Sequence, residues 1–587
     1  MPRPVAVALL AVAVAVFAIA APQARQEPLG KIDFPTSQTG PAQDAFVHGV
    51  LLLHSFEYDD AKEAFQQAQK AAPDFAMAYW GEAMTYNHPL WSQTAPDPAR
   101  EALGKLAATR EQRLAKAGND KERDWLRAVE ALYGEGEKPA RDLAYAAEMR
   151  RMNDKYPDDL EVKAFYALAL LGSSQGRDVG TYMKAAALVE DVVRVNPQHP
   201  GAIHYLIHAY DDPAHAPLGL RYAEAYAKIA PAASHALHMP SHIYFALGMW
   251  DKAAELNERS AKAADERVSR KGLGVDDRGF HALLWLTYSY LQQGRYQDAH
   301  EVLDQIDKAA AESGSVRTRS HLALARAAWV IETRRWTDAK PDGVNPEGLG
   351  ADATAADLFA IGMAAFRSGN RAAGSDALQR MATLAGDGDR PVRSVTTAKP
   401  STTRPNTSRP GVTPMPVPRP SLPTPAELIA AQTAAAGQPQ TGLPAAGSGN
   451  DKRVAAIMAQ QLEAILIFSE GRRDEGLVLA RQAAAVEDDL SFEFGPPLPV
   501  KPGHELVGDL SMDVRRPGDA VVAYEAALKR YPGRALSLLG LYRAAMASRQ
   551  PQKAQQAAAE LRKIWQRADK TLPELREIAA VPPPSSH

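Results

Sequence analysis

The sequence has 587 residues, of which 45% are hydrophobic and 23% are charged, and its formal net charge at pH 7 is −3. A chain of this length and composition can bury several domains' worth of core, so it is not disordered as a whole. Its small net charge gives no positive field that would attract nucleic acid without sequence preference. The absence of cysteine excludes disulfides, thiolate metal ligands and cysteine nucleophiles. Any metal site must therefore use histidine, aspartate or glutamate.

The N-terminus has the pattern of a secretory signal peptide. A basic start at Arg3 precedes seventeen apolar residues from Val5 to Ala21, which end in an Ala-x-Ala sequence at 18–20. The run is short for a membrane span, which needs about 20 residues; an uncleaved anchor is the alternative. We predict a signal peptide over residues 1–21, a mature protein without a membrane span, and a periplasmic or secreted location.

The mature sequence is repetitive. In the first clear unit, Phe46 to Pro73, Gly49 on one expected helix is followed on a second by Ala61, Phe65 and Ala68 at helical spacing. Small residues let two antiparallel helices approach closely, the phenylalanine fills the space between them, and the proline ends the second helix. This is the tetratricopeptide pattern, whose period is 34 residues.

The same pattern returns downstream. Its clearest copies contain Gly248-Met249-Trp250 with Ala253, Gly294-Arg295-Tyr296 with Ala299, and Ala520 with Tyr524, Ala527 and Pro532. Weaker copies fill most of the intervening chain. The sequence therefore predicts an all-α fold, an α-solenoid of tetratricopeptide-like helix pairs with a concave inner groove.

A segment of different composition interrupts the repeats. Between Pro391 and Pro425 there are ten prolines and five basic residues but no acidic residue. Such a sequence cannot bury enough apolar surface to offset the entropy of ordering it. We predict a disordered Pro/Thr/Ser-rich linker over 387–450, between an N-terminal array over 41–385 and a C-terminal array over 451–579. The linker is either a tolerated surface insertion or a partner-binding segment.

Seven of the 15 histidines lie close together in the sequence, in two groups. In the first group, Pro200 is placed to begin a helix and Pro213 to end it at Asp212. His204, His208 and Asp212 are then spaced i, i+4 and i+8, so they share one helix face.

The second group repeats the first at the tetratricopeptide period. His238 follows His204 by 34 residues, and His242 follows His208 by 34. Equivalent positions on neighbouring repeats lie side by side, so the four imidazoles are expected to converge on one patch of the groove. The expected ligand set is His204, His208, Asp211, Asp212, His238 and His242.

Imidazole and carboxylate ligands suit zinc, copper or iron, and two histidines at i and i+4 on a helix can chelate one ion. The alternative is that these side chains are polar contacts that fix helix–helix interfaces. No metalloenzyme motif such as H-E-x-x-H decides between the two. Pro240 also leaves the position of His238 undecided, because a helix that begins at the proline would put this histidine on the preceding loop.

Other histidines are weaker candidates. His281 stands where the next repeat would extend the patch. His54 and His88 lie near the ends of the first two inner helices and are more simply explained as structural contacts. His504 follows a proline-rich bend at 496–499, which would fold across the groove if the solenoid closed on itself.

Four segments of the sequence carry a resemblance to known proteins. They are the motif His-Pro-Gly-Ala-Ile-His-Tyr-Leu-Ile-His-Ala-Tyr-Asp-Asp-Pro at 199–213, the second histidine group at 235–250, the segment Ala76 to Ala83 and the tetrapeptide His88 to Trp91. In these segments the chain resembles a group of bacterial exported tetratricopeptide proteins. The resemblance implies an α-solenoid but carries over no biochemical activity. The tetratricopeptide superfamily as a whole implies binding of a peptide or protein in the concave groove.

Two functions are compatible with the sequence. The first is an exported scaffold that binds a peptide or protein partner in its groove, which is the common use of solenoids. The second is a metal-binding protein, or a metalloenzyme such as an oxidase or hydrolase, with a divalent transition metal as cofactor. Asp211 or Asp212 would then be a ligand or general base, and the ion would polarise a substrate oxygen or lower the pKa of bound water. Nucleic acid is not an expected partner.

Overall fold

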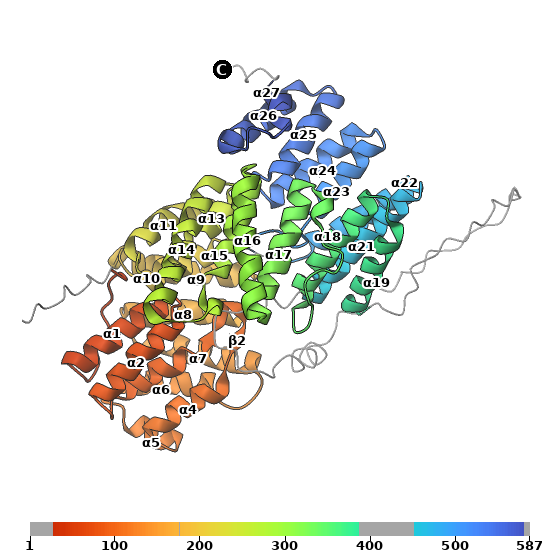
Figure 1. Ribbon diagram of the computed structural model, residues 1–587. Coiled ribbons are helices and arrows are strands. Elements are labelled where there is room, and N and C mark those ends of the chain that lie inside the picture. The colour runs from red at the N-terminus through yellow and green to blue at the C-terminus, as the bar shows by residue number, and fades with distance from the viewer. Residues whose placement is uncertain (1–27, 175, 387–450, 493, 580–587) are drawn as a thin grey trace, which may run out of the picture.

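The computed structural model describes residues 28–174, 176–386, 451–492 and 494–579. The predicted signal peptide and the predicted linker lie outside these residues. Helix pairs make up almost all of the described chain (Figure 1), which confirms the all-α solenoid. None of the described helices is both long enough and apolar enough to cross a bilayer.

The first array runs from α1 to α19. Its helices are α1 (Gly40–His54), α2 (Tyr58–Ala71), α3 (Ala76–Met84), α4 (Pro96–Leu106), α5 (Arg110–Ala115), α6 (Asp120–Leu132), α7 (Lys138–Lys155), α8 (Leu160–Ser173), α9 (Val179–Val195), α10 (Pro200–Ala209), α11 (Ala216–Ile229), α12 (Ser234–His238), α13 (Pro240–Ala246), α14 (Trp250–Lys271), α15 (Phe280–Gln292), α16 (Tyr296–Ser313), α17 (Val316–Thr333), α18 (Ala351–Arg367) and α19 (Arg371–Ala385).

The second array follows the predicted linker. Its helices are α21 (Asp451–Ser469), α22 (Arg473–Asp488), α23 (Gly503–Asp513), α24 (Pro517–Arg530), α25 (Ala535–Ala547), α26 (Pro551–Ile564) and α27 (Glu574–Ala579).

In the first repeat, the aromatic residue is clamped between two glycines. Phe65 on α2 has no exposed surface, and a Cβ atom added to Gly49 of α1 or Gly81 of α3 would lie 2.7 or 2.3 Å from its ring. The two glycines lie on consecutive first helices, 32 residues apart in the sequence. Since neither position has room for a side chain, the packing of the three helices requires glycine at both.

The second array contains the same contact. Tyr524 on α24 lies between Gly508 of α23 and Gly540 of α25, where added Cβ atoms would lie 2.7 and 2.3 Å from its ring. The hydroxyl group of Tyr524 donates to Asp509 at 2.7 Å. The predicted repeat is therefore present in both arrays.

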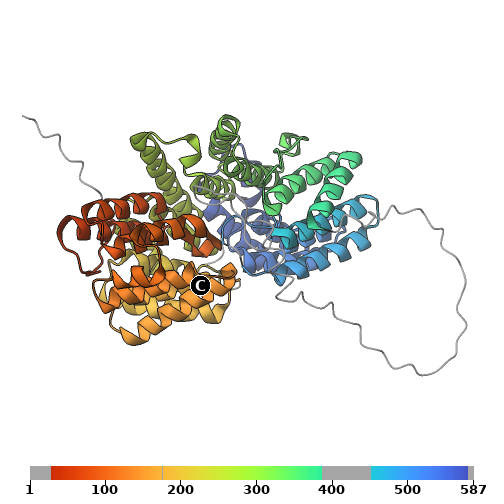
Figure 2. The ribbon, with the colours of Figure 1, turned by 90° about the horizontal axis from the view of Figure 1, so that it is seen from below.

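The two arrays form one stack that bends back on itself. Helix α21 packs against both α18 and α19, so the second array continues directly from the first. Further along, the indole Nε1 of Trp250 donates to the carbonyl oxygen of Gly533 at 2.8 Å. Figures 1 and 2 show the C-terminal helices lying beside the middle of the N-terminal array. This curvature brings the chain between α22 and α23 onto the inner face of the first array.

A short hairpin interrupts the helices after α3. Strands β1 (Asn87–His88) and β2 (Gln93–Thr94) pair antiparallel around the 3-10 turn Pro89–Trp91. The hairpin holds the Trp91 ring 5.5 Å from the ring of Phe56, which follows α1. Both aromatic rings then border the histidines described below.

Replacing Phe65 with alanine is expected to lower the free energy of unfolding by about 3–5 kcal/mol, because it leaves a cavity between two glycines that cannot fill it. Chemical denaturation followed by circular dichroism measures the change. Leu143→Ala is the matched control, because Leu143 is 61% exposed and its truncation removes no core packing. A loss below about 1 kcal/mol for Phe65→Ala would contradict the role of the clamped ring.

Candidate metal centre

Six histidines from four helices lie together on the inner face of the first array. They are His204 and His208 on α10, His235 and His238 on α12, His242 on α13 and His281 on α15. Five of them are buried and His281 is partly buried. The structure thus brings the four expected histidines together and adds two neighbours to them.

The two histidines of α10 face each other across one helical turn. The Nε2 atoms of His204 and His208 are 3.2 Å apart. The Nδ1 atom of His204 lies 2.7 Å from the backbone carbonyl oxygen of His54. Because a carbonyl oxygen only accepts, this Nδ1 carries the proton, and on the neutral ring Nε2 is unprotonated. The lone pair of His204 Nε2 therefore points at His208.

The second pair repeats this arrangement, with the Nε2 atoms of His238 and His242 3.1 Å apart. His238 Nδ1 donates to Oδ1 of Asn257 at 2.7 Å, and the Asn257 amide nitrogen donates to the Ala253 carbonyl at 2.8 Å, which fixes the amide orientation. His242 Nδ1 donates to the carboxylate of Asp211 at 2.5 Å. On neutral rings, both Nε2 atoms are therefore unprotonated.

Two lone pairs at this distance repel each other unless a cation lies between them. A proton on His238 is disfavoured, because burial, together with the nearby His242 imidazole, holds the pKa of His238 well below its usual range. A metal ion fits the spacing, since two imidazole nitrogens that each ligate one ion at about 2.0–2.1 Å are themselves about 3.0–3.4 Å apart. The hydrogen bond from His242 to Asp211 is of the carboxylate–histidine kind that orients imidazoles in known metal sites.

Each pair gains a third histidine from the next first helix of the stack. A ring nitrogen of His281 joins His238 and His242, and a ring nitrogen of His235 joins His204 and His208; within each triad these nitrogens all lie within 4.8 Å of one another. The triads adjoin, because the ring centroids of His208 and His242 are 5.3 Å apart. A carboxylate oxygen of Asp211 lies within the same 4.8 Å limit of both of these rings.

Asp212 does not share the predicted helix face. The prediction that the helix ends at Asp212 is wrong, because α10 ends at Ala209. Arg177 donates to the carbonyl oxygens of His208 and Ala209 at 3.2 and 2.9 Å, which satisfies the end of the helix. It also binds the Asp212 carboxylate at 2.8 Å, and that carboxylate accepts from the backbone N–H of His215 at 3.0 Å. Asp212 therefore holds the following turn.

Pro240 begins α13, as the sequence allowed, but it does not place His238 on a loop. His238 is the last residue of α12, and Met239 between the two helices has φ −53° and ψ −39°, which is helical. The turn therefore continues through the junction, and His238 and His242 keep their i, i+4 contact.

A third group next to the pairs, His54, Glu161 and His199, has a different character. His54 Nε2 donates to Glu161 at 2.8 Å while its Nδ1 accepts from the Tyr205 hydroxyl at 2.8 Å. His199 Nδ1 accepts from the backbone N–H of Ala202 at 3.1 Å, and its Nε2 lies 3.1 Å from the other Glu161 oxygen. Each imidazole lone pair here meets a donor. The group is a structural network that positions the His54 carbonyl group.

Two weaker candidates lie apart from the six histidines. His88 stacks on Tyr58 with ring centroids 4.0 Å apart, and His504 Nε2 bonds the carboxylate of Asp488 at 2.9 Å. Neither belongs to a possible ligand group among the described residues. The sequence had recognised His281 only as an extension of the patch, and nothing in its spacing marked His235 as a third ligand.

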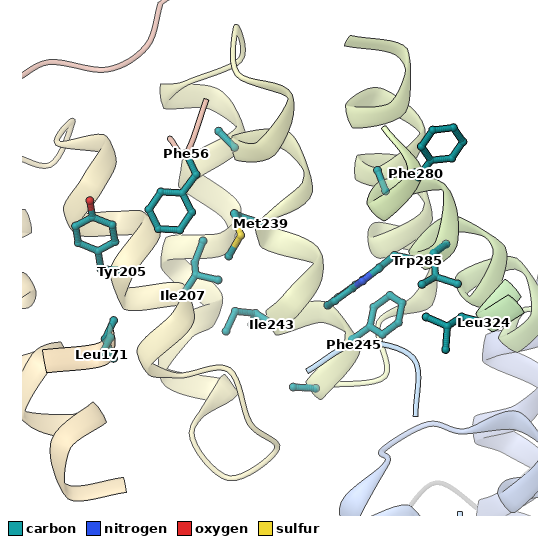
Figure 3. Close-up of a cluster of buried hydrophobic side chains, with 14 of the residues drawn as sticks. Phe56, Leu171, Tyr205, Ile207, Met239, Ile243, Phe245, Phe280, Trp285 and Leu324 are labelled. Atoms are coloured by element: carbon teal, nitrogen blue, oxygen red, sulfur yellow. The ribbon is translucent and has the colours of Figure 1, made fainter. Parts of the chain in front are cut away.

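Apolar side chains surround the histidines. Figure 3 shows Phe56, Ile207 and Ile243 around α10 and α13, with Phe245 and Trp285 beside the segment from the second array. The ring of Phe56 lies 4.3 Å from that of His204. Burial among these groups lowers the pKa of His204 to about 3, so its imidazole is neutral at physiological pH.

The proline-rich bend between α22 and α23 covers the centre. The ring of Phe494 lies 4.7 Å from that of His242 and 5.9 Å from that of His208. Gly495 has a φ of +108°, and a Cβ atom there would lie 2.9 Å from the ring of Trp285. The bend therefore crosses the groove, as expected for a solenoid that closes on itself, and it separates the histidines from bulk solvent.

No family model matches the sequence, and no curated protein matches it either. Among solved structures, the chain is similar to the APC/C hetero-tetramer Cut9–Hcn1 (TM-score 0.34, 9% identity, 92% of this chain and 76% of the other). It is also similar to a Rap protein complexed with competence and sporulation factor (TM-score 0.31, 14% identity, 58% of this chain and 97% of the other). A third similar structure is yeast Tom70 (TM-score 0.28, 12% identity, 92% of this chain and 94% of the other). Likeness at this level assigns no function.

Glu487, near the end of α22, links this helix to the start of α23 across the bend and to the residue that follows α24. Its carboxylate accepts from the backbone N–H of Gly503, the first residue of α23, at 2.6 Å, and from the hydroxyl of Tyr531 at 3.3 Å. Burial raises the pKa of Glu487 to about 7. The carboxyl group is therefore protonated in the folded protein at a pH where it is ionised in the unfolded chain.

A carboxyl group with a raised folded-state pKa stabilises the fold fully below its unfolded pKa of about 4.5, and this contribution is lost as pH rises to 7. Glu487→Gln stays neutral at every pH. We expect the melting temperature of the wild type, relative to that of Glu487→Gln, to be higher at pH 5 than at pH 8. Equal differences at the two pH values would show that the buried carboxyl group does not titrate in this range.

Proposed function

We propose that this protein binds a transition-metal ion through His238, His242 and His281. The observation that carries the proposal is the 3.1 Å contact between the Nε2 atoms of His238 and His242, on rings whose Nδ1 protons are already donated elsewhere. While both Nδ1 protons are donated in this way, neither neutral ring has an Nε2 proton to offer the other. An ion placed between the rings removes the repulsion and uses both lone pairs.

The contacts behind the rings suit ligands. Asp211 accepts a hydrogen bond from Nδ1 of His242, which makes the Nε2 lone pair of this ring a stronger metal ligand. Asn257 accepts one from Nδ1 of His238 and fixes the plane of that ring. Three imidazoles are compatible with zinc, copper or iron. A bound ion of this kind supplies a Lewis acid that polarises a substrate oxygen or lowers the pKa of bound water.

Three protein ligands leave a coordination position open, as in catalytic rather than structural zinc sites. A small cavity lies against Asp211 and His242, and Phe245, Phe494 and Tyr531 are among the residues that line its other walls. The cavity gives a small molecule a place beside the ion, while the bend keeps larger ligands out.

Binding of a peptide or protein partner is the second candidate, and an open groove between α14, α15 and α16 favours it. The groove is lined by the acidic residues Glu258, Asp265, Glu266, Asp298 and Glu301 and by the basic residues Lys262 and Arg270. Its excess of carboxylates suits a basic segment. The groove lies on other residues than the histidines, so the two functions do not compete for one surface.

The location of the protein belongs to the same proposal. The signal peptide predicted over residues 1–21 would place the metal centre in the periplasm or outside the cell, and the resemblance to exported tetratricopeptide proteins supports this. Sequencing the N-terminus of the mature protein tests it, and we expect the first residue at or near Ala21.

Protein purified without a histidine tag or chelator is expected to contain transition metal by elemental analysis, and apoprotein is expected to take up Co²⁺ with visible ligand-field bands. His238→Ala together with His242→Ala should remove this metal, because each substitution deletes a ligand. The fold should remain, because the substitutions relieve a buried repulsion rather than break core packing.

His300→Ala is the matched control, because His300 is half-exposed on α16 and belongs to none of the ligand groups among the described residues. Its metal content should equal that of the wild type. If the folded double variant retains stoichiometric metal, the proposal is wrong.

A further inference from the structure

We infer that the second triad, His204, His208 and His235, holds a second transition-metal ion, so that the centre is built for two ions. The inference rests on the proposed function for the first ion, which it extends to a neighbouring set of ligands. The contacts around this triad are independent of those around the first, because the two triads share no histidine.

The strongest observation is an unsatisfied ring nitrogen. Nε2 of His235 is buried and has no hydrogen-bond partner in the described part of the chain, and the residue as a whole is only 7% exposed. The rings of Phe56 and Trp91 lie 5.5 and 5.8 Å from its ring and offer no acceptor or donor in their faces. A buried polar atom without a partner is costly, so it calls for a ligand.

The other two members are already oriented. The His54 carbonyl group fixes the tautomer of His204 and leaves its Nε2 lone pair facing His208 Nε2 at 3.2 Å. A proton on His208 Nε2 would satisfy that pair but would leave His235 without a partner. An ion coordinated by all three rings satisfies every member at once.

The two triads share one construction. Each consists of an i, i+4 pair and a third histidine from the next first helix, which is α12 for the second triad and α15 for the first. In both, one ligand of the pair donates its Nδ1 proton to an acceptor outside the triad. The same repeat geometry that builds one ligand set therefore builds the other.

Asp211 lies between the two sets. Its Oδ2 accepts from His242 of the first triad, while its Oδ1 is buried without a partner among the described residues. The carboxylate is also close to His208 of the second triad. The free oxygen is placed to bind the second ion or a water on it, which would link the two ions through one carboxylate. Two neighbouring ions suit a small oxygen-containing ligand that both can hold.

The test is the number of ions bound by the full-length apoprotein in titrations with Co²⁺ and with Zn²⁺. The wild type should bind two equivalents. His235→Ala and His281→Ala should each bind one, because each removes a ligand from a different triad. His300→Ala should keep two. Circular dichroism and melting temperature check the fold, and His204→Gln repeats the test of the second triad if His235→Ala does not fold.

The outcomes separate the two proposals. One equivalent in the wild type that persists in His235→Ala and disappears in His281→Ala overturns the second ion and leaves the proposed function standing. One equivalent that disappears in both variants shows a single shared ion and also overturns the inference. No bound metal in the folded wild type overturns both. Only a fall from two equivalents to one in each variant supports a two-ion centre.

Discussion

The contact between a glycine, an aromatic ring and a second glycine holds consecutive first helices of the stack close together, and the proposed metal centre depends on close stacking of this kind. Phe65 lies between Gly49 and Gly81, and Tyr524 lies between Gly508 and Gly540, so one ring separates two consecutive first helices in each array. Since a close-packed interface tolerates little variation, equivalent positions on neighbouring repeats are held side by side. Histidines repeated at the period of the stack are thereby brought together without any dedicated loop.

Hydrogen bonds then decide what the gathered histidines can do. In the group of His54, Glu161 and His199, each imidazole lone pair meets a donor, and the side chains form an ordinary buried network. In the pair of His238 and His242, Nδ1 of each ring donates a hydrogen bond, to Asn257 and Asp211 respectively, so the Nε2 lone pairs face each other. The two groups differ in the hydrogen-bond partners of their rings, and this difference distinguishes a structural network from the proposed ligand set.

The sequence predicted the elements that follow from local rules. Pro200 begins α10 as expected, and the 34-residue interval correctly placed His204 near His238 in the stack. Asp212 was misplaced because Arg177, which lies between α8 and α9, binds the last carbonyl groups of α10 and ends this helix early. His235 could be placed near the patch from the sequence but not recognised as a possible ligand, because the orientation of its ring depends on the helix junction at Met239. Phe494 could not be recognised as a neighbour, because its position depends on the closure of the whole stack.

That closure depends on buried charge. Arg534, which has no exposed surface, pairs with Glu505 of α23 at 2.7 Å and with Glu332 of α17 at 2.6 Å, and donates to the Tyr288 hydroxyl of α15 at 2.6 Å. A buried ion pair adds little net stability, but leaving one charge unpaired is costly, so such a group favours a single arrangement.

Glu505 ties this arrangement to the bend, because it also pairs with Lys501 at the end of the bend at 2.9 Å. The charges thus fix where the second array meets the first, and with it the position of Phe494 over the histidines. Exclusion of water from the centre strengthens every electrostatic interaction within it. The long-range closure of the solenoid is therefore part of the proposed metal centre, although its residues lie far along the chain from the histidines.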